Sequence, residues 1–309
     1  MLKPFDILVA GEINPDLILS GNIEPNFSQV EQLVDSATLT IGSSSAIFAC
    51  GAARLGLKVA FIGKCGEDVF GRFMLEEMRK RNVDVGNVII SADAPTGMGV
   101  ILNRGVDRWI LTHLGLISAL RADEIPDGLL RQARHLHVAS YFLQQALQPG
   151  LPGLFQRAHH LSLTTSLDTN YDPSGQWKGF DALLDVTDVF LPNEAEACSL
   201  TGAETPEKAA DRLGERLDTL AVKLGAKGAL GISKGKKIRV PSIPIQVVDT
   251  VGAGDSFDAG FLFGWLNGWS LRETLALAVA CGSLSTRSAG GTPAQPTLAE
   301  AMRYLSSSG

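Results

Sequence analysis

The chain has little cysteine and no excess of basic charge. It contains 309 residues with 4 Cys, and Lys+Arg 27 against Asp+Glu 33 give a formal net charge of −6. The cysteines lie far apart and form no CxxC pair, which excludes a disulfide-stapled protein and indicates reduced thiols in a cytoplasmic one. Because basic residues are scattered, the sequence lacks the positive surface that duplex nucleic acid requires, and we expect no nucleic-acid partner.

Long apolar runs and dividing linkers are also missing. No stretch approaches the ~20 apolar residues of a membrane span, and the start MLKPFDILVAGE predicts a strand rather than a signal peptide. We therefore expect no membrane partner. No repeat or low-complexity segment divides the chain, so its length allows either two domains or one large α/β unit with insertions.

Two common nucleotide motifs are absent. The sequence has no GxxxxGK[ST] loop, and no GxGxxG follows its first predicted strand. The first absence excludes a P-loop nucleotide site, and the second disfavours a dinucleotide-dependent dehydrogenase. A phosphate site in this chain must have another architecture.

Short apolar runs alternate with helical patterns over most of the sequence. This alternation predicts an open, mostly parallel sheet with helices on both faces. Two stretches break the rhythm, and one of them, ILNRGVDRWILTHL, predicts a hairpin. We expect a core of residues 1–15, 41–95 and 115–309, with a small β-rich lid of residues 16–40 and 96–114.

The most informative segment is the nonapeptide DTVGAGDSF at 249–257. Glycines in a turn that opens a helix let the amides of Gly252, Ala253 and Gly254 converge on an anion, and the helix dipole adds positive potential. Asp255 follows in the first helical turn, where a carboxylate can accept a proton from an attacking hydroxyl. The alternative is that Asp255 only caps the helix.

The nonapeptide resembles the C-terminal signature of the ribokinase-like, or PfkB, carbohydrate kinases. GEINPDLIL, the Gly-Ser turn at 42, LPNEAEACSLTG and VKLGAKGAL precede it in the family's order, so the resemblance covers nearly the whole chain. It implies a three-layer α/β/α core with a mostly parallel sheet and a small β-rich lid. It also implies that Asp255 is the base and that the amides of Gly252, Ala253 and Gly254 hold the transferred phosphoryl group.

The resemblance further implies ATP and Mg²⁺ as cofactors. Asn193 and Glu196 match the family's N-x-x-E element, which is associated with Mg²⁺ and its waters, although the same spacing is also a capping box. VKLGAKGAL is implied to approach the nucleotide, with a plain hairpin as the alternative. The implied nucleotide contacts are Asn193, Lys223, Gly225, Gly228 and Thr250. Asp249 and the carbonyl of Val251 are implied as ligands of a monovalent cation such as K⁺, an option that the sequence leaves open.

At the acceptor end, the resemblance implies that a small sugar contacts Asn14, Asp16, Gly42, Ser43 and Asn170. Amide and carboxylate groups suit a polyol because they pair with adjacent hydroxyls. The chain departs from the family pattern at three positions. Ser43 replaces a usual glycine, Ile47 replaces an asparagine that commonly contacts the sugar, and Asp172 replaces an arginine, which disfavours an acidic sugar.

The sequence thus predicts an ATP-dependent kinase that phosphorylates a hydroxyl of a small sugar. A nucleoside kinase of the same family is one alternative, since the altered first signature could admit a base attached to a ribose. A non-catalytic sugar-binding protein is another, against which the intact DTVGAGD and NEAE elements argue. Because lids of this family often pair, the resemblance also implies a homodimer through the lid.

Overall fold

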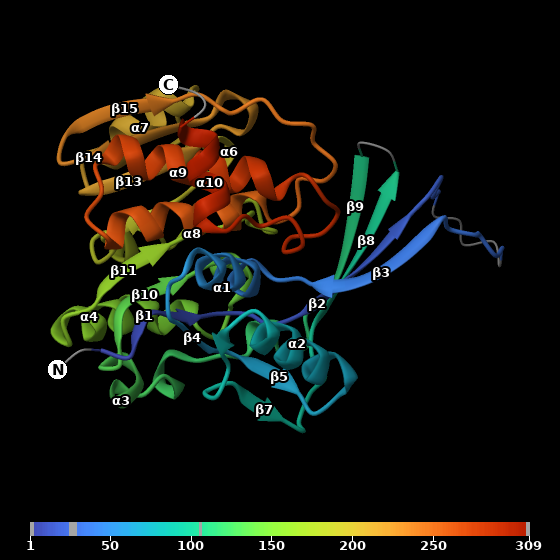
Figure 1. The fold of residues 1–309 in the computed structure, drawn as a ribbon. Helices are drawn as coiled ribbons and strands as arrows, with labels where there is room; N and C mark the ends of the chain where they lie inside the picture. Colours follow the sequence, from blue (N-terminus) through green and yellow to red (C-terminus); the bar gives the residue numbers. More distant parts are fainter. Residues whose placement is uncertain (1–2, 25–29, 105–106, 307–309) are drawn as a thin grey trace.

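A nine-stranded sheet forms the middle of the molecule (Figure 1). The structure is a computed structural model that describes residues 3–24, 30–104 and 107–306. Neighbouring strands from β13 to β6 run parallel, and β14 and β15 add an antiparallel edge. The strands, in their order across the sheet, are β15 (Lys236–Val240), β14 (Ala229–Ser233), β13 (Thr219–Lys223), β12 (Val189–Phe190), β11 (Thr164–Leu167), β10 (Ala133–Val138), β1 (Phe5–Ala10), β4 (Val59–Ile62) and β6 (Val83–Asp84).

Helices cover both faces of this sheet, and strand β1 shows why. Its Ile7 and Val9 belong to one apolar cluster, whereas Leu8 and Ala10 belong to another, and all four are fully buried. Parallel strands covered on both faces read as continuous apolar runs, as this one does. One face carries α1 (Ser44–Leu55), α2 (Val69–Lys80), α8 (Ala253–Leu266), α9 (Leu271–Ser285) and α10 (Leu298–Ser306). The other carries α3 (Asp127–Leu130), α4 (Leu151–His160), α5 (Asp181–Leu184), α6 (Glu194–Thr201) and α7 (Pro206–Gly214).

A four-stranded sheet projects from the side of the core (Figure 1). Its strands, in order, are β3 (Ser36–Ile41), β2 (Pro15–Ser20), β8 (Met98–Arg104) and β9 (Asp107–His113). The predicted hairpin is confirmed, because β8 and β9 pair antiparallel from Met98 opposite His113 to Arg104 opposite Asp107. Residues 105 and 106 of its turn lie outside the described residues. The three-layer core and the small second sheet confirm the fold class.

Two further segments complete the core. Strand β7 (Ile89–Ser91) pairs with β5 (Lys64–Gly66) in a separate two-stranded sheet. The chain leaves the main sheet after Val240, because Pro241 and Pro244 lack the amide hydrogens that a sheet requires. None of the helices in the described part of the chain is long and apolar enough to cross a membrane.

Close packing of α8 on α9 depends on glycine. A Cβ on Gly260 would lie 2.9 Å from the Cα of Ala278 and 3.0 Å from the Sγ of Cys281. We expect Gly260→Ala to lower the free energy of unfolding by about 1–3 kcal/mol, although alanine is the better helix former. The matched control is Gly153→Ala in α4, where a Cβ meets nothing within 4 Å and stability should rise slightly. Equal thermal shifts in the two variants would contradict this account.

Candidate active site

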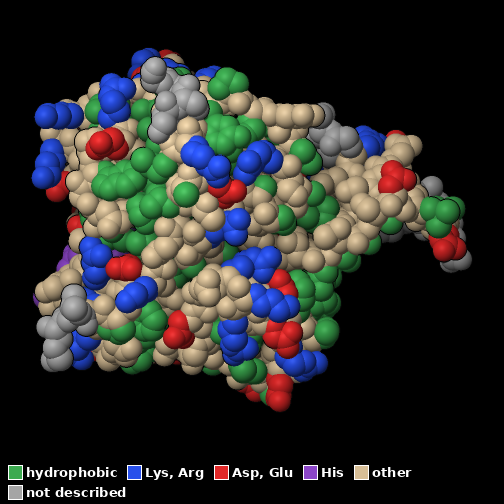
Figure 2. Space-filling model, in the orientation of Figure 1, with side chains coloured by type: hydrophobic (Ala, Val, Ile, Leu, Met, Phe, Trp, Pro, Cys, Tyr) green, Lys and Arg blue, Asp and Glu red, His purple; other side chains and the backbone are tan. Residues whose placement is uncertain are grey.

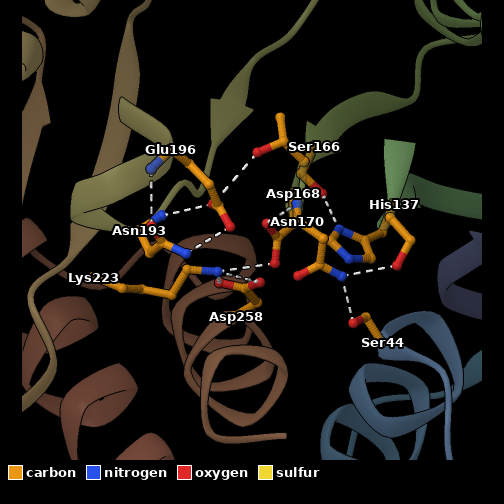
Figure 3. Close-up of polar contacts among 11 residues, drawn as sticks. Ser44, His137, Ser166, Asp168, Asn170, Asn193, Glu196, Lys223 and Asp258 are labelled. Atoms are coloured by element: carbon orange, nitrogen blue, oxygen red, sulfur yellow. Dashed lines mark hydrogen bonds and ion pairs between the residues drawn. The ribbon is translucent and has the colours of Figure 1, made fainter. Parts of the chain in front are cut away.

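The main sheet brings polar residues together where its parallel strands end. Asn14 follows β1, Ser140 follows β10, Asn170 follows β11 and Asn193 follows β12. The carboxyl ends of parallel strands meet at one edge, which is where open α/β sheets bind ligands. Ser140 and Asn170 have positive φ angles of 52° and 53°, a backbone conformation that tends to cluster at functional sites. The amide of Asn170 donates to the hydroxyl of Ser140 at 2.8 Å and to that of Ser44 (Figure 3).

Helix α8 begins at the same edge with the predicted anion-binding turn. Gly252 is its N-cap with a φ of 72°, and a Cβ there would lie 2.6 Å from the Cα of Gly291. Only glycine fits this position. The Ala253 amide donates to the Thr250 carbonyl at 3.3 Å, whereas no described residue accepts from the amides of Gly252 or Gly254. The turn therefore presents two free amides beside the helix dipole.

Asp255 lies in the first turn of α8 and is 7% exposed. Its carboxylate and those of Asp168 and Asp258 have oxygens within 4.8 Å of one another. Burial raises the pKa of Asp255 well above its ordinary value, and the charge of Asp168 raises it further. A carboxylate with a raised pKa is a suitable proton acceptor for a hydroxyl once a substrate is in place.

Lys223 places an ammonium group among these carboxylates (Figure 3). Its Nζ lies 2.9 Å from Oδ2 of Asp168 and 3.1 Å from Oδ2 of Asp258. Burial alone would lower the pKa of Lys223, but the charges of Asp168 and Asp258 raise it. The site therefore contains its own part-buried cation.

Asn193 and Glu196 form the predicted capping box at the start of α6. The Glu196 amide donates to Oδ1 of Asn193 at 2.9 Å, and the Asn193 amide donates to Oε2 of Glu196 at 2.8 Å. Thr169 also donates to Glu196 at 3.3 Å. Burial, and then the charge of Asp168, raises the pKa of Glu196 to about 7. This oxygen-rich donor set suits Mg²⁺, which is commonly held through water.

A mostly apolar cavity of about 560 Å³ adjoins the start of α8. It collects the predicted nucleotide contacts Lys223, Gly225, Gly228 and Thr250, but not Asn193. The sequence did not reveal its apolar walls, because the residues that form them come from several segments of the chain. The described lining residues also include Ile243, Pro244, Ile245, Val247, Ala253, Gly254, Phe257 and Val279.

At the predicted sugar site, two glycines lie close to the carboxylate of Asp16: Gly99 in β8 and Gly42 just after β3. A Cβ on Gly42 or on Gly99 would lie 2.3 Å from Oδ1 of Asp16. Asn14 donates to the same oxygen at 3.2 Å. Asn14, Asp16 and Gly42 thus lie together, and the glycines are needed because Asp16 occupies the space beside them.

The surroundings of Ser43 and Ile47 explain why the chain departs from the family pattern at these two positions. Ser43 keeps a positive φ of 65°, as a glycine would, and its hydroxyl caps α1 by accepting from the Ala46 amide at 3.0 Å. Ile47 is 3% exposed and packs against Gly252 and Gly291. It therefore fills space behind the predicted anion-binding turn.

Asp249 is held by backbone amides. It accepts from the amide of Val251 at 3.0 Å and from that of Gly290 at 2.9 Å, and Arg108 of β9 lies 3.9 Å away. Asp249 and Val251 thus share one loop, and the hydrogen bond from Gly290 holds a second segment beside it.

The family model described as pfkB family carbohydrate kinase matches residues 5–298. The chain belongs to this family. It is 34% identical over 279 residues to the 2-dehydro-3-deoxygluconokinase of Bacillus subtilis, with 84% of each chain covered. It also resembles the structure of Arabidopsis thaliana ribokinase complexed with ribose and ATP (25% identity, TM-score 0.83, coverage of 97% and 98%). A putative ribokinase II of E. coli in complex with ATP and Mg²⁺ shares the fold (23% identity, TM-score 0.87, coverage of 98% and 99%).

The sequence of this kinase alone did not identify the residues that surround the predicted base, Asp255. Asp258, Glu12 and Ser44 all act on Asp255 electrostatically or through hydrogen bonding. A charged residue inside the apolar pattern of α8 was the available signal for Asp258. The carboxylate of Asp172 accepts from amides of its own loop, including that of Trp177 at 2.7 Å.

Asp16 gives the kinase a pH-dependent stability. Burial raises the pKa of Asp16 to about 6 from 3.8. The ionised carboxylate is thus less stable in the folded state, so Asp16 lowers stability as pH rises through this window. We expect Asp16→Asn to increase the free energy of unfolding, relative to wild type, by up to roughly 2 kcal/mol more at pH 7.5 than at pH 4.5. Denaturant unfolding at both pH values tests this, with exposed Asp211→Asn as control; a pH-independent difference would contradict it.

Proposed function

We propose that this carbohydrate kinase transfers the γ-phosphoryl group of ATP to a hydroxyl of a small sugar, with Asp255 as the base. The observation that carries this proposal is that the cavity and the predicted base meet at the start of one helix, α8. Ala253 and Gly254 line the cavity proposed to hold the nucleotide, and Asp255 follows them immediately in the same turn. A phosphoryl group at this turn would therefore lie next to the base, as in-line transfer requires.

Each part of the turn has a distinct role in the proposal. Asp255 accepts the proton of the attacking hydroxyl, and the amides of Gly252 and Gly254 stabilise negative charge on the transferred group. The Ala253 amide, already bonded to Thr250, acts mainly by fixing the turn. Such oriented donors are effective because they need no rearrangement during the reaction.

The cavity supports a role for ATP and Mg²⁺ as cofactors. So do two similar structures, one complexed with ribose and ATP and the other with ATP and Mg²⁺. Lys223, Gly225, Gly228 and Thr250 would contact the nucleotide, while Asn193 and Glu196 would hold Mg²⁺ through water. Bound Mg²⁺ would supply charge neutralisation of the phosphates. Asp249 and the carbonyl of Val251 are proposed to take a monovalent cation such as K⁺.

The acceptor sugar is proposed to contact Asn14, Asp16, Gly42, Ser43 and Asn170. Residues 16–40 and 96–114 would act as a lid over the core formed by 1–15, 41–95 and 115–309. Closure of such a lid would exclude water, which matters because water competes with the sugar hydroxyl for the phosphoryl group.

We expect Asp255→Asn to reduce turnover by about 10²–10⁴-fold while leaving nucleotide affinity within a few fold, because only proton transfer is removed. ADP release with D-ribose, D-fructose, 2-dehydro-3-deoxygluconate and adenosine measures turnover, and calorimetry measures ATP binding. Adenosine as the preferred acceptor would support a nucleoside kinase instead. ATP binding without ADP release from any acceptor would support a non-catalytic protein. Near-normal turnover of Asp255→Asn would show that Asp255 is not the base.

The lid sheet is also proposed to pair between two copies of the chain. Its outer strand exposes apolar side chains, including Trp109 at 49%, Ile110 at 48% and Leu111 at 44% exposure, and Figure 2 shows hydrophobic side chains on the projecting part. Size exclusion with light scattering should give a dimer for the wild type and a monomer for Ile110→Glu. An unchanged mass for the variant would contradict pairing through this strand.

A further inference from the structure

Lys223 extends from the end of β13 to a point between the nucleotide cavity and the predicted base. It lines the cavity, and an ideal Cβ on Gly254 would lie 3.5 Å from its Nζ, so the side chain passes the anion-binding turn. Its ammonium ends between Asp168 and Asp258 (Figure 3). One cation thus contacts the cavity, the turn and the carboxylate cluster.

Asp258 is an unusual residue for its place in the helix. It lies three positions after Asp255 on α8, so the two side chains are neighbours on one side of the helix. It is 1% exposed within an otherwise apolar segment. A buried carboxylate is costly unless it is paired, and both its oxygens lie within 3.2 Å of the Lys223 ammonium.

We propose that Asp258 is a positioning residue, which together with Asp168 fixes the Lys223 ammonium beside the start of α8 and thereby sets the charge around Asp255. This inference rests on the proposed role of Asp255 as the base. Asp258 itself would touch neither sugar nor nucleotide. It would act through Lys223.

The charges that face Asp255 come from several elements. They are Glu12 after β1, Asp168 after β11, Lys223 on β13 and Asp258 on α8. The carboxylates make it harder for Asp255 to lose its proton, and the ammonium makes it easier.

Removal of the ammonium should therefore move the ionisation of Asp255 to higher pH. Removal of Asp258 leaves one fewer carboxylate to share the ammonium and should move it to lower pH.

The test compares Lys223→Met with Asp258→Asn, in the full chain. ADP release is measured between pH 5 and 9 with the sugar of the panel that the wild type uses best. We expect the acid limb of kcat to rise by about one pH unit in Lys223→Met and to fall in Asp258→Asn. We expect kcat to drop about 100-fold and about tenfold, respectively, with a smaller change in the KM for the sugar.

Matched controls separate this role from simple loss of an ion pair. Lys237→Met and Asp211→Asn break an exposed pair of 2.7 Å and should leave the pH profile unchanged. Lys223→Arg keeps the charge and should restore the position of the acid limb. Should Lys223→Met fail to fold, Asp258→Asn and Lys223→Arg still decide the question. Acid limbs that stay in place, or that move in the same direction, would overturn the proposal.

A measurement without turnover keeps the two proposals distinguishable. NMR titration of ¹³C-labelled aspartate carboxyls follows Asp255 directly, its signal assigned by its absence in Asp255→Asn. Opposite shifts of this titration in Lys223→Met and Asp258→Asn would support the positioning role, whether or not the wild type phosphorylates a sugar of the panel. A wild type that phosphorylates none of these sugars would count only against the proposed function. Unmoved titration with normal wild-type turnover would overturn only the positioning role.

Discussion

The contact between the Lys223 ammonium and the buried carboxylates of Asp168 and Asp258 is the interaction on which the site depends. It joins the end of β13, the end of β11 and the first turns of α8. Carboxylates of Asp168, Asp255 and Asp258 crowd within 4.8 Å, and burial makes their repulsion strong. A neighbouring ammonium lowers that cost, which allows acidic residues to collect where the strands end.

This arrangement also explains how a chain with a net charge of −6 can favour an anionic nucleotide. Overall charge acts at long range and is screened by salt, whereas a ligand in a cavity meets local groups. The cavity has apolar walls that include Ile243, Ile245 and Val247. Lys223 and Gly254, whose amide is free, also line it. Binding then combines apolar burial with a small number of oriented donors.

The parts of the site that are local in sequence could be predicted, and the parts that depend on packing could not. The capping box of Asn193 and Glu196 and the turn at 249–257 each lie within one short segment, so spacing alone reveals them. Ile47 meets Gly252 and Gly291 only because α1 packs on α8. The role of Asp258 likewise depends on Lys223, which is distant in sequence and arrives from another strand.

Asp16 links the small sheet to the core at the place proposed for the sugar. Asp16 lies on β2 opposite Thr40 of β3 and Gly99 of β8, and its carboxylate fills the space that side chains at Gly42 and Gly99 would occupy. Movement of either neighbouring strand must therefore displace this carboxylate or be resisted by it. Asn14, which donates to Asp16, follows β1 of the core. If the proposed sugar contacts hold, a sugar between these residues would touch core and small sheet at once, and its binding would be energetically coupled to the position of the sheet.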